Sequence, residues 1–242
     1  RTKDKASKII VISDEKNPLY SRCLISYLLA GTISEKKIWF RPDNFFKTNK
    51  VEALLGVKAK EINTKKKEIS ISNKEKVNFD KLLIATGASP KLEDIPGIDK
   101  RGVFPLRTIE HTIEIQSMLD KVKSVAVLGG GLIGLRAAYA LKNRGKDVSV
   151  FVKSSSILSQ IIDKDAAGMM QKRIEEKGIK IFTGVAAKEI TGDKLARGII
   201  FDNGSEIAGD RHACPLLIII GKGVSPNIEI AKDAGIKTNW GI

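Results

Sequence analysis

Short apolar runs alternate with stretches of helical periodicity along the second half of this 242-residue chain. The apolar runs are rich in β-branched residues, and glycine or polar turns separate them from the helical stretches. This alternation predicts a parallel sheet wound on both sides by helices. The expected strands cover 124–128, 148–152, 179–182 and 216–220, with a further β stretch at 186–201, and the expected helices cover 109–120, 132–144 and 164–177.

Shorter signals fill the first hundred residues. An apolar strand at 9–13 ends in Asp14 and Glu15, and a helix over about 21–30 is stopped by Gly31. Two short strands, 57–62 and 68–72, are expected to pair around the polar turn 63–67. Leu82–Ala85 has the pattern of a buried strand that runs into a turn at Thr86 and Gly87, and 90–102 is the best linker candidate.

A glycine motif stands between the expected strand at 124–128 and the helix that follows it. Gly129, Gly131 and Gly134 form a G-x-G-x-x-G turn, and the next strand begins near Val148. Such a turn lets a pyrophosphate approach the backbone and sit on the positive end of the helix. We therefore predict a dinucleotide site here in preference to an ordinary glycine turn.

The charge of the chain is strongly positive but dispersed. Forty-two Lys and Arg residues against 28 Asp and Glu give a net charge of +14, which would attract phosphates, anionic cofactors or an acidic partner. The densest run, 65–67, has Glu61 and Glu68 close by and no interleaved aromatic residues. This pattern is typical of a solvated hairpin, so we predict no nucleic-acid binding.

Several other classes of site are disfavoured by composition. No apolar run approaches the ~20 residues of a membrane span. Cys23 and Cys214 are too few for a disulfide framework and favour reduced thiols in the cytoplasm. His111 and His212 lie far apart with no paired cysteine cluster, so no metal site is predicted.

Taken in order, these motifs resemble the pyridine nucleotide-disulfide oxidoreductase family, specifically the FAD and NAD(P)H reductases similar to NADH:rubredoxin reductase and the flavin domains of nitrite reductase large subunits. The matching segments cover nearly the whole chain and are specific as a set. They are Val11–Glu15, Tyr20–Arg22, Phe79–Ala88, Ile95–Gly97, Gly129–Ala138 and Gly221–Asn227.

The resemblance implies an α/β fold of two nested Rossmann-like nucleotide-binding domains, with parallel central sheets and a small antiparallel β addition. Residues 1–100 would form a partial FAD-binding domain, and 101–242 the NAD(P)-binding domain, whose last residues lead back toward the FAD domain. The family's first strand and its own glycine motif would precede Arg1, and its closing Gly-Asp motif and interface domain would follow Ile242. We therefore expect a fragment that can bind NAD(P) but holds flavin weakly or not at all.

For FAD, the resemblance assigns the adenosine ribose to Glu15, whose carboxylate can accept both ribose hydroxyls. Asp14 competes for that role, and a capping or solvated acid is the plainer alternative. Arg22 would pair with the pyrophosphate, although a surface arginine is the alternative. The backbone near Ala59 would touch the adenine, and Thr86 and Gly87 would close over the cofactor.

For NAD(P), the resemblance gives the turn to the glycines and the phosphate-binding amides to the start of the helix. The resemblance also implies that two further glycines pass close to the nicotinamide. The alternative interpretation of these two glycines is a plain loop after a buried strand. The residues are Gly129, Gly131 and Gly134 for the turn, Leu132 and Ile133 for the amides, and Gly221 and Gly223 near the nicotinamide.

Two departures from the family pattern concern charge. Where an acid is expected about 20 residues after the glycines, the chain has Val152, followed by Lys153 and Ser154–Ser156. The lysine and hydroxyls could bind a 2′-phosphate, which favours NADPH over a weakly selective NADH site. Arg136 stands where relatives often carry a glutamate near the nicotinamide, so it could instead attract phosphate or an acidic partner.

The resulting hypothesis is an FAD-dependent NAD(P)H oxidoreductase that passes electrons to a small acceptor such as rubredoxin. The cofactors perform hydride transfer, so no dedicated catalytic residue is predicted. Cys23 falls short of the redox position of some relatives, and a buried thiol is expected. The alternatives are a non-catalytic NAD(P)-binding or redox-sensing module and a one-cofactor dehydrogenase, for which the catalytic residue set is missing; the oligomeric state is left open.

Overall fold

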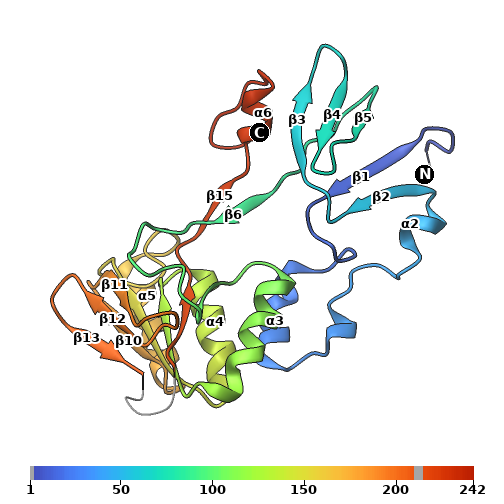
Figure 1. The fold of residues 1–242 in the computed structure, drawn as a ribbon. Coiled ribbons are helices and arrows are strands. Elements are labelled where there is room, and N and C mark those ends of the chain that lie inside the picture. Colours follow the sequence, from blue (N-terminus) through green and yellow to red (C-terminus); the bar gives the residue numbers. More distant parts are fainter. Residues whose placement is uncertain (1–2, 210–214) are drawn as a thin grey trace. The chain divides into compact units, whose positions relative to one another are not determined.

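The computed structural model describes residues 3–209 and 215–242 (Figure 1). Contacts between Cα atoms divide the chain into two compact units. Unit 1 contains the residues up to 21 together with 39–89 and 225–242, and unit 2 contains 22–38 and 90–224.

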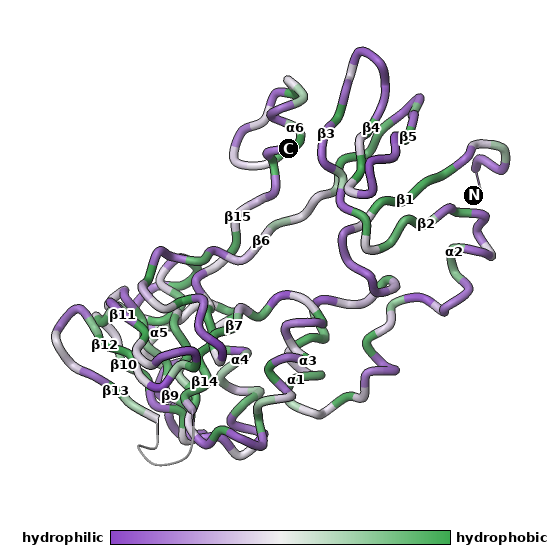
Figure 2. The backbone as a smooth tube through the Cα atoms, viewed as in Figure 1, coloured by the Kyte–Doolittle hydropathy of each residue, from purple (hydrophilic) through white to green (hydrophobic). Residues whose placement is uncertain are grey.

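A five-stranded parallel sheet forms the centre of unit 2. Its strand order is β10-β9-β8-β14-β7, and each pair of neighbours is parallel. The apolar strands appear among the green segments in Figure 2, and all four residues of β14 are buried. The predicted parallel sheet is therefore confirmed; its strands are β7 (Val103–Pro105), β8 (Ser124–Leu128), β9 (Asp147–Val152), β10 (Lys180–Thr183) and β14 (Leu217–Ile220).

Helices cover one face of this sheet. Helix α4 (Leu132–Asn143) packs on β8, β9 and β14, while α5 (Lys164–Glu175) contacts β10 and α3 (Ile109–Met118) contacts β7. Helix α1 (Ile25–Ala30) lies against α3 and α4. Glycine at Gly31, with φ of 72°, ends α1 as predicted. The short 3₁₀ turns are η1 (Arg22–Leu24), η2 (Glu35–Lys37) and η3 (Leu119–Lys121).

The opposite face carries strands instead of helices. An antiparallel sheet of β11 (Ala187–Thr191), β12 (Gly198–Phe201) and β13 (Glu206–Ala208) shares a buried apolar cluster with β8, β9 and β14. The rings of Phe151 and Phe201 meet there with centroids 4.5 Å apart. The prediction of helices on both faces is wrong, because this sheet supplies the apolar cover.

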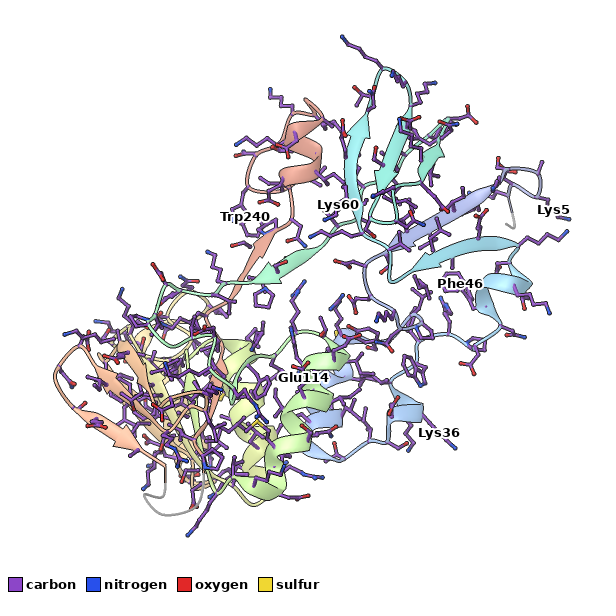
Figure 3. The ribbon with its side chains drawn as sticks, in the orientation of Figure 1. Lys5, Lys36, Phe46, Lys60, Glu114 and Trp240 are labelled. Carbon is purple, nitrogen blue, oxygen red and sulfur yellow. The ribbon has the colours of Figure 1, made fainter. Side chains whose placement is uncertain are left out.

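Unit 1 is built on two small sheets. The predicted strand at 9–13 is confirmed as β1 (Ile9–Ser13), which pairs in parallel with β2 (Val51–Leu55). Strands β3 (Ala59–Asn63), β4 (Glu68–Ile71) and β5 (Lys76–Asn78) form the antiparallel sheet around the predicted turn. Helix α6 (Glu229–Asp233) contacts β3, and the short α2 (Phe45–Thr48) contacts β2. Lysines such as Lys60 extend into solvent (Figure 3).

The predicted buried strand at Leu82–Ala85 is wrong. No described strand pairs with these residues, and Leu83 is 87% exposed. Leu82 and Ile84 pack on the apolar cluster of the β3–β4–β5 sheet, so the segment buries one face only. Strand β6 (Ala88–Pro90) begins beyond the turn and pairs with β15 (Val224–Pro226). Across the described ranges, helices with the length and apolar character needed to cross a membrane are absent.

Three glycines bring the backbones of β8, α4 and β14 into direct contact. A Cβ added at Gly134 would lie 2.1 Å from the carbonyl oxygen of Gly129. One added at Gly129, whose φ is 125°, would lie 2.4 Å from the oxygen of Gly221. One at Gly221 would lie 2.7 Å from the Cα of Gly134. These distances exclude any side chain at the three positions unless the backbone moves.

We expect Gly134→Ala to destabilise unit 2 by about 1–3 kcal/mol, because the added methyl group overpacks the start of α4. The matched control is Gly168→Ala in α5, where a Cβ meets nothing within 4 Å. That change should stabilise the protein by up to about 1 kcal/mol through helix propensity. Urea unfolding measures both. Similar effects of the two substitutions would contradict the assigned contact.

Candidate functional site

A cavity of about 280 Å³ opens at the carboxyl ends of β8, β9 and β14 in unit 2. In a parallel sheet this edge is where ligands characteristically bind. The walls come from the strand ends and from the loops that follow them. They comprise 128–131, 151–154, 158–161, 185–187 and 221–223, together with Glu93.

Gly131 differs from the other glycines at this edge. A Cβ added there would meet no atom within 4 Å, and its backbone angles (φ −81°, ψ 176°) are open to any residue. Neither the packing nor the backbone of the chain therefore requires glycine at this position. A ligand that approaches the backbone closely would require it.

The amino end of α4 faces the cavity without a side-chain cap. The N-cap is Gly131, no cap hydrogen bond forms, and the first turn contains no acidic residue. By contrast, Thr108 caps α3 and Asp163 caps α5. The first backbone N–H groups of a helix have no partner within it and carry its positive dipole end. The amides of Leu132 and Ile133 are thus suited to an anion.

Cationic and hydroxyl side chains border the cavity beyond β9. Lys153 and Ser154 line it as the sequence suggests, and Ser159 joins them. The Ser159 hydroxyl donates to Ser154 Oγ over 3.1 Å, and the Ser154 hydroxyl donates to the Ser156 carbonyl over 2.9 Å. Among the residues that the structure describes, none forms an ion pair with Lys153. Ser159 was missed because it lies outside the Lys-Ser-Ser-Ser run.

In unit 1, the predicted ribose-binding carboxylate is held in place by a tyrosine. The Tyr20 hydroxyl donates to Glu15 Oε2 over 2.5 Å, and the Glu15 amide donates to Ser13 Oγ over 3.2 Å. Glu15 is half-buried at the end of β1, whereas Asp14 is exposed. The arrangement favours Glu15 over Asp14 as the residue that presents a fixed carboxylate.

Asn227 fixes the predicted turn at Thr86 and Gly87. Its side-chain amide donates to the Thr86 carbonyl over 2.9 Å, and its backbone amide donates to the Gly87 carbonyl over 2.9 Å. The Thr86 hydroxyl donates back to the Asn227 carbonyl over 2.5 Å. Gly87 has a φ of 66°, which explains glycine there. Ala59 begins β3, half-buried. Asn227 is the last residue of the matching segment Gly221–Asn227, but its hydrogen bonds to Thr86 and Gly87 were not predicted.

Comparison with known proteins identifies the family of the chain. The family model described as pyridine nucleotide-disulphide oxidoreductase matches residues 1–242. The chain belongs to this family. Its members are FAD- and NAD(P)H-dependent oxidoreductases.

Several curated relatives match nearly the whole chain, among them two from Bacillus subtilis and Methanocaldococcus jannaschii. The assimilatory nitrate reductase electron transfer subunit of Bacillus subtilis is 35% identical over 97% of this chain and 30% of its own length. The NADH oxidase of Methanocaldococcus jannaschii is 34% identical over 98% of the chain and 53% of its own length. The crystal structure of a ferredoxin reductase from Rhodopseudomonas palustris is 27% identical, with a TM-score of 0.91, and covers 100% of this chain and 59% of that one.

Arg136, which departs from the family pattern, joins two helices. Its Nε donates to the Ser26 hydroxyl over 3.0 Å, and its guanidinium lies over the Tyr27 ring, 5.0 Å from the centroid. These contacts tie α4 to α1. Arg136 is exposed and does not line the cavity.

The remaining predicted residues lie in unit 2 or outside the described ranges. Arg22 Nη1 donates to the Arg107 carbonyl over 3.1 Å. The expectation of a buried thiol at Cys23 is wrong. Cys23 is exposed because it lies in η1, a short 3₁₀ turn in which no residue is buried. His111 accepts the Thr108 amide in the α3 capping box. Cys214 and His212 lie outside the described residues, within which no cluster of metal-ligating side chains occurs.

We expect Gly131→Ala to leave the free energy of unfolding within about 0.5 kcal/mol of the wild type, since the methyl group meets no atom of the chain. The same methyl group should weaken dinucleotide binding at least tenfold by blocking the approach to the backbone. NADH fluorescence titration measures the binding, with Gly168→Ala as the control. Unchanged NADH affinity in Gly131→Ala would contradict the assigned approach.

Proposed function

We propose that the cavity of unit 2 binds NAD(P)H and that the chain is the nucleotide-binding part of an FAD-dependent oxidoreductase. The observation that carries this proposal is the position of Gly131, at an uncapped helix start and with room above its backbone. A diphosphate at this point would accept hydrogen bonds from the amides of Leu132 and Ile133. Gly221 and Gly223, which line the same cavity, would pass close to the nicotinamide.

We assign FAD to unit 1, as part of two nested nucleotide-binding domains. Glu15 would hold the adenosine ribose, with Tyr20 fixing one carboxylate oxygen. Thr86 and Gly87 would close over the cofactor in the turn that Asn227 holds. The backbone near Ala59 would meet the adenine. The boundary predicted near residue 100 stays a prediction, as does the role of Arg22 toward the FAD pyrophosphate.

Hydride transfer between nicotinamide and flavin is the chemistry that the bound cofactors supply. The residues of this chain bind and orient the two nucleotides, and no side chain is assigned as an acid or base. The chain spans about 30% of the Bacillus subtilis relative and about half of the Methanocaldococcus jannaschii relative, so the activity of the whole protein is itself part of the proposal. We infer a small electron-carrier protein as the acceptor, with rubredoxin as the candidate.

Purified complete gene product is expected to be yellow and to lose its flavin absorbance when NAD(P)H is added without oxygen. The physical reason is that two electrons pass from the dinucleotide to the flavin. Anaerobic absorbance spectroscopy near 450 nm measures the change. A colourless protein that still binds dinucleotide would instead support a sensing or binding module without turnover.

We further propose that the site prefers NADPH. Lys153 and the hydroxyls of Ser154 and Ser159 border the cavity beyond β9, where the family's ribose-binding acid is replaced by Val152. A 2′-phosphate there would find a cation and hydroxyl donors without a carboxylate from β9 to repel it. The other reading is a weakly selective NADH site.

Substituting Lys153→Glu should abolish a preference for NADPH. Charged hydrogen bonds contribute about 1.5–3 kcal/mol, which corresponds to a loss of about ten- to 150-fold in NADPH affinity. NADH affinity should change much less, because NADH lacks the 2′-phosphate. Separate NADH and NADPH titrations measure both, and exposed Lys172→Glu on α5 is the control. Equal affinities for the two nucleotides in wild type and variant would overturn the assignment.

A further inference from the structure

Lys222 is a second cation at the cavity, on the opposite side of the glycine turn from Lys153. It follows β14 between Gly221 and Gly223, and its side chain is 12% exposed. Its backbone nitrogen lies 3.3 Å from the point where a Cβ of Gly129 would be. Lys222 therefore adjoins the turn whose backbone the proposed diphosphate approaches.

Glu93 pairs with this lysine from the linker that precedes β7. The Lys222 ammonium donates to Glu93 Oε2, and both residues line the cavity. The linker is held beside this loop, because the Lys91 amide donates to the Gly223 carbonyl over 3.0 Å. Glu93 supplies the one carboxylate among the cavity's described lining residues.

The pair is asymmetric in its access to water. The Glu93 side chain is 48% exposed, four times as much as that of Lys222. The Glu93 carboxylate can therefore turn to solvent and be hydrated there at little cost in free energy. The more buried Lys222 ammonium would stay at the cavity wall. A diphosphate with two negative charges also attracts the Lys222 ammonium more strongly than the single Glu93 carboxylate does. The negative charge of Glu93 would repel the same diphosphate.

We propose that Lys222 is a phosphate-binding side chain of the dinucleotide site and that Glu93 is its exchange partner. This inference rests on the proposed function. Without nucleotide, the Lys222 ammonium is paired with the Glu93 carboxylate. When the diphosphate binds, the ammonium pairs with the diphosphate oxygens instead, and the Glu93 carboxylate turns to solvent. Because the ligand must displace Glu93, the pair lowers the apparent affinity for the nucleotide.

The two members of the pair are therefore expected to have opposite effects on NADH binding. Lys222→Met removes the cation and should weaken NADH binding about tenfold. Glu93→Gln removes the competitor and should strengthen NADH binding roughly threefold. NADH carries no 2′-phosphate, so the effect reports on the diphosphate. ADP-ribose, which has the diphosphate and lacks nicotinamide, should show the same two changes in calorimetric titrations.

The exposed ion pair of Arg173, in α5, and Glu176, the residue that caps the end of α5, supplies matched controls in the same unit, with a distance of 3.2 Å between the charged groups. Arg173→Met and Glu176→Gln alter the net charge equally and should leave NADH affinity unchanged. Thermal unfolding of all four variants, and Lys222→Gln as a second neutral substitution, separate loss of binding from loss of fold.

Each outcome bears on a different statement. Wild-type protein that binds neither NADH nor ADP-ribose would refute the proposed function itself. If the wild type binds both, unchanged affinity in folded Lys222→Met or Lys222→Gln would overturn the exchange. Weaker binding in Glu93→Gln would also overturn it, because Glu93 would then contact the ligand directly. An effect of Lys222 on NADH that is missing with ADP-ribose would place the ammonium at the nicotinamide and likewise refute the proposal.

Discussion

The contact among Gly129, Gly134 and Gly221 is the constraint on which the cavity depends. Because none of the three has a side chain, the turn after β8, the start of α4 and the end of β14 meet backbone to backbone. This contact sets the uncapped end of α4 at the carboxyl edge of the sheet, where its N–H groups face the cavity. Wider spacing at any of the three points would move the helix dipole away from that edge.

Backbone and side chains divide the recognition of an anion between them. The amides at the start of α4 attract any diphosphate, whichever nucleotide carries it. Lys153 and Lys222 stand at the ends of different strands, so each can act on a different part of an extended ligand. Local placement matters here more than the net charge of +14, since most lysines, such as Lys60, lie in solvent.

Local signals in the sequence were sufficient for four of the five strands of the central sheet and for the glycine turn, because strand periodicity and G-x-G-x-x-G spacing are properties of neighbouring residues. The short edge strand β7 was not predicted. Local signals failed where contacts between segments distant in the sequence determine the structure. The apolar run at 82–85 finds cover on one face only, and an antiparallel sheet replaces the expected helices on one side of unit 2. The bond of Asn227 to Thr86 spans 141 residues and the pair of Lys222 and Glu93 spans 129, separations at which a single sequence carries no pairing signal.

Arg136 shows how a charge opposite to that of the family pattern is accommodated without a change in the backbone contact of the three glycines. The sequence offered phosphate or an acidic partner for its guanidinium, whereas in the structure Ser26 and Tyr27 engage it between α4 and α1. The residue lies two positions beyond Gly134, and its contacts are with Ser26 and Tyr27 of α1, so its packing does not involve Gly129 or Gly221. Charges around the site can therefore differ from the family pattern while the contact of the three glycines keeps the same entrance for a diphosphate.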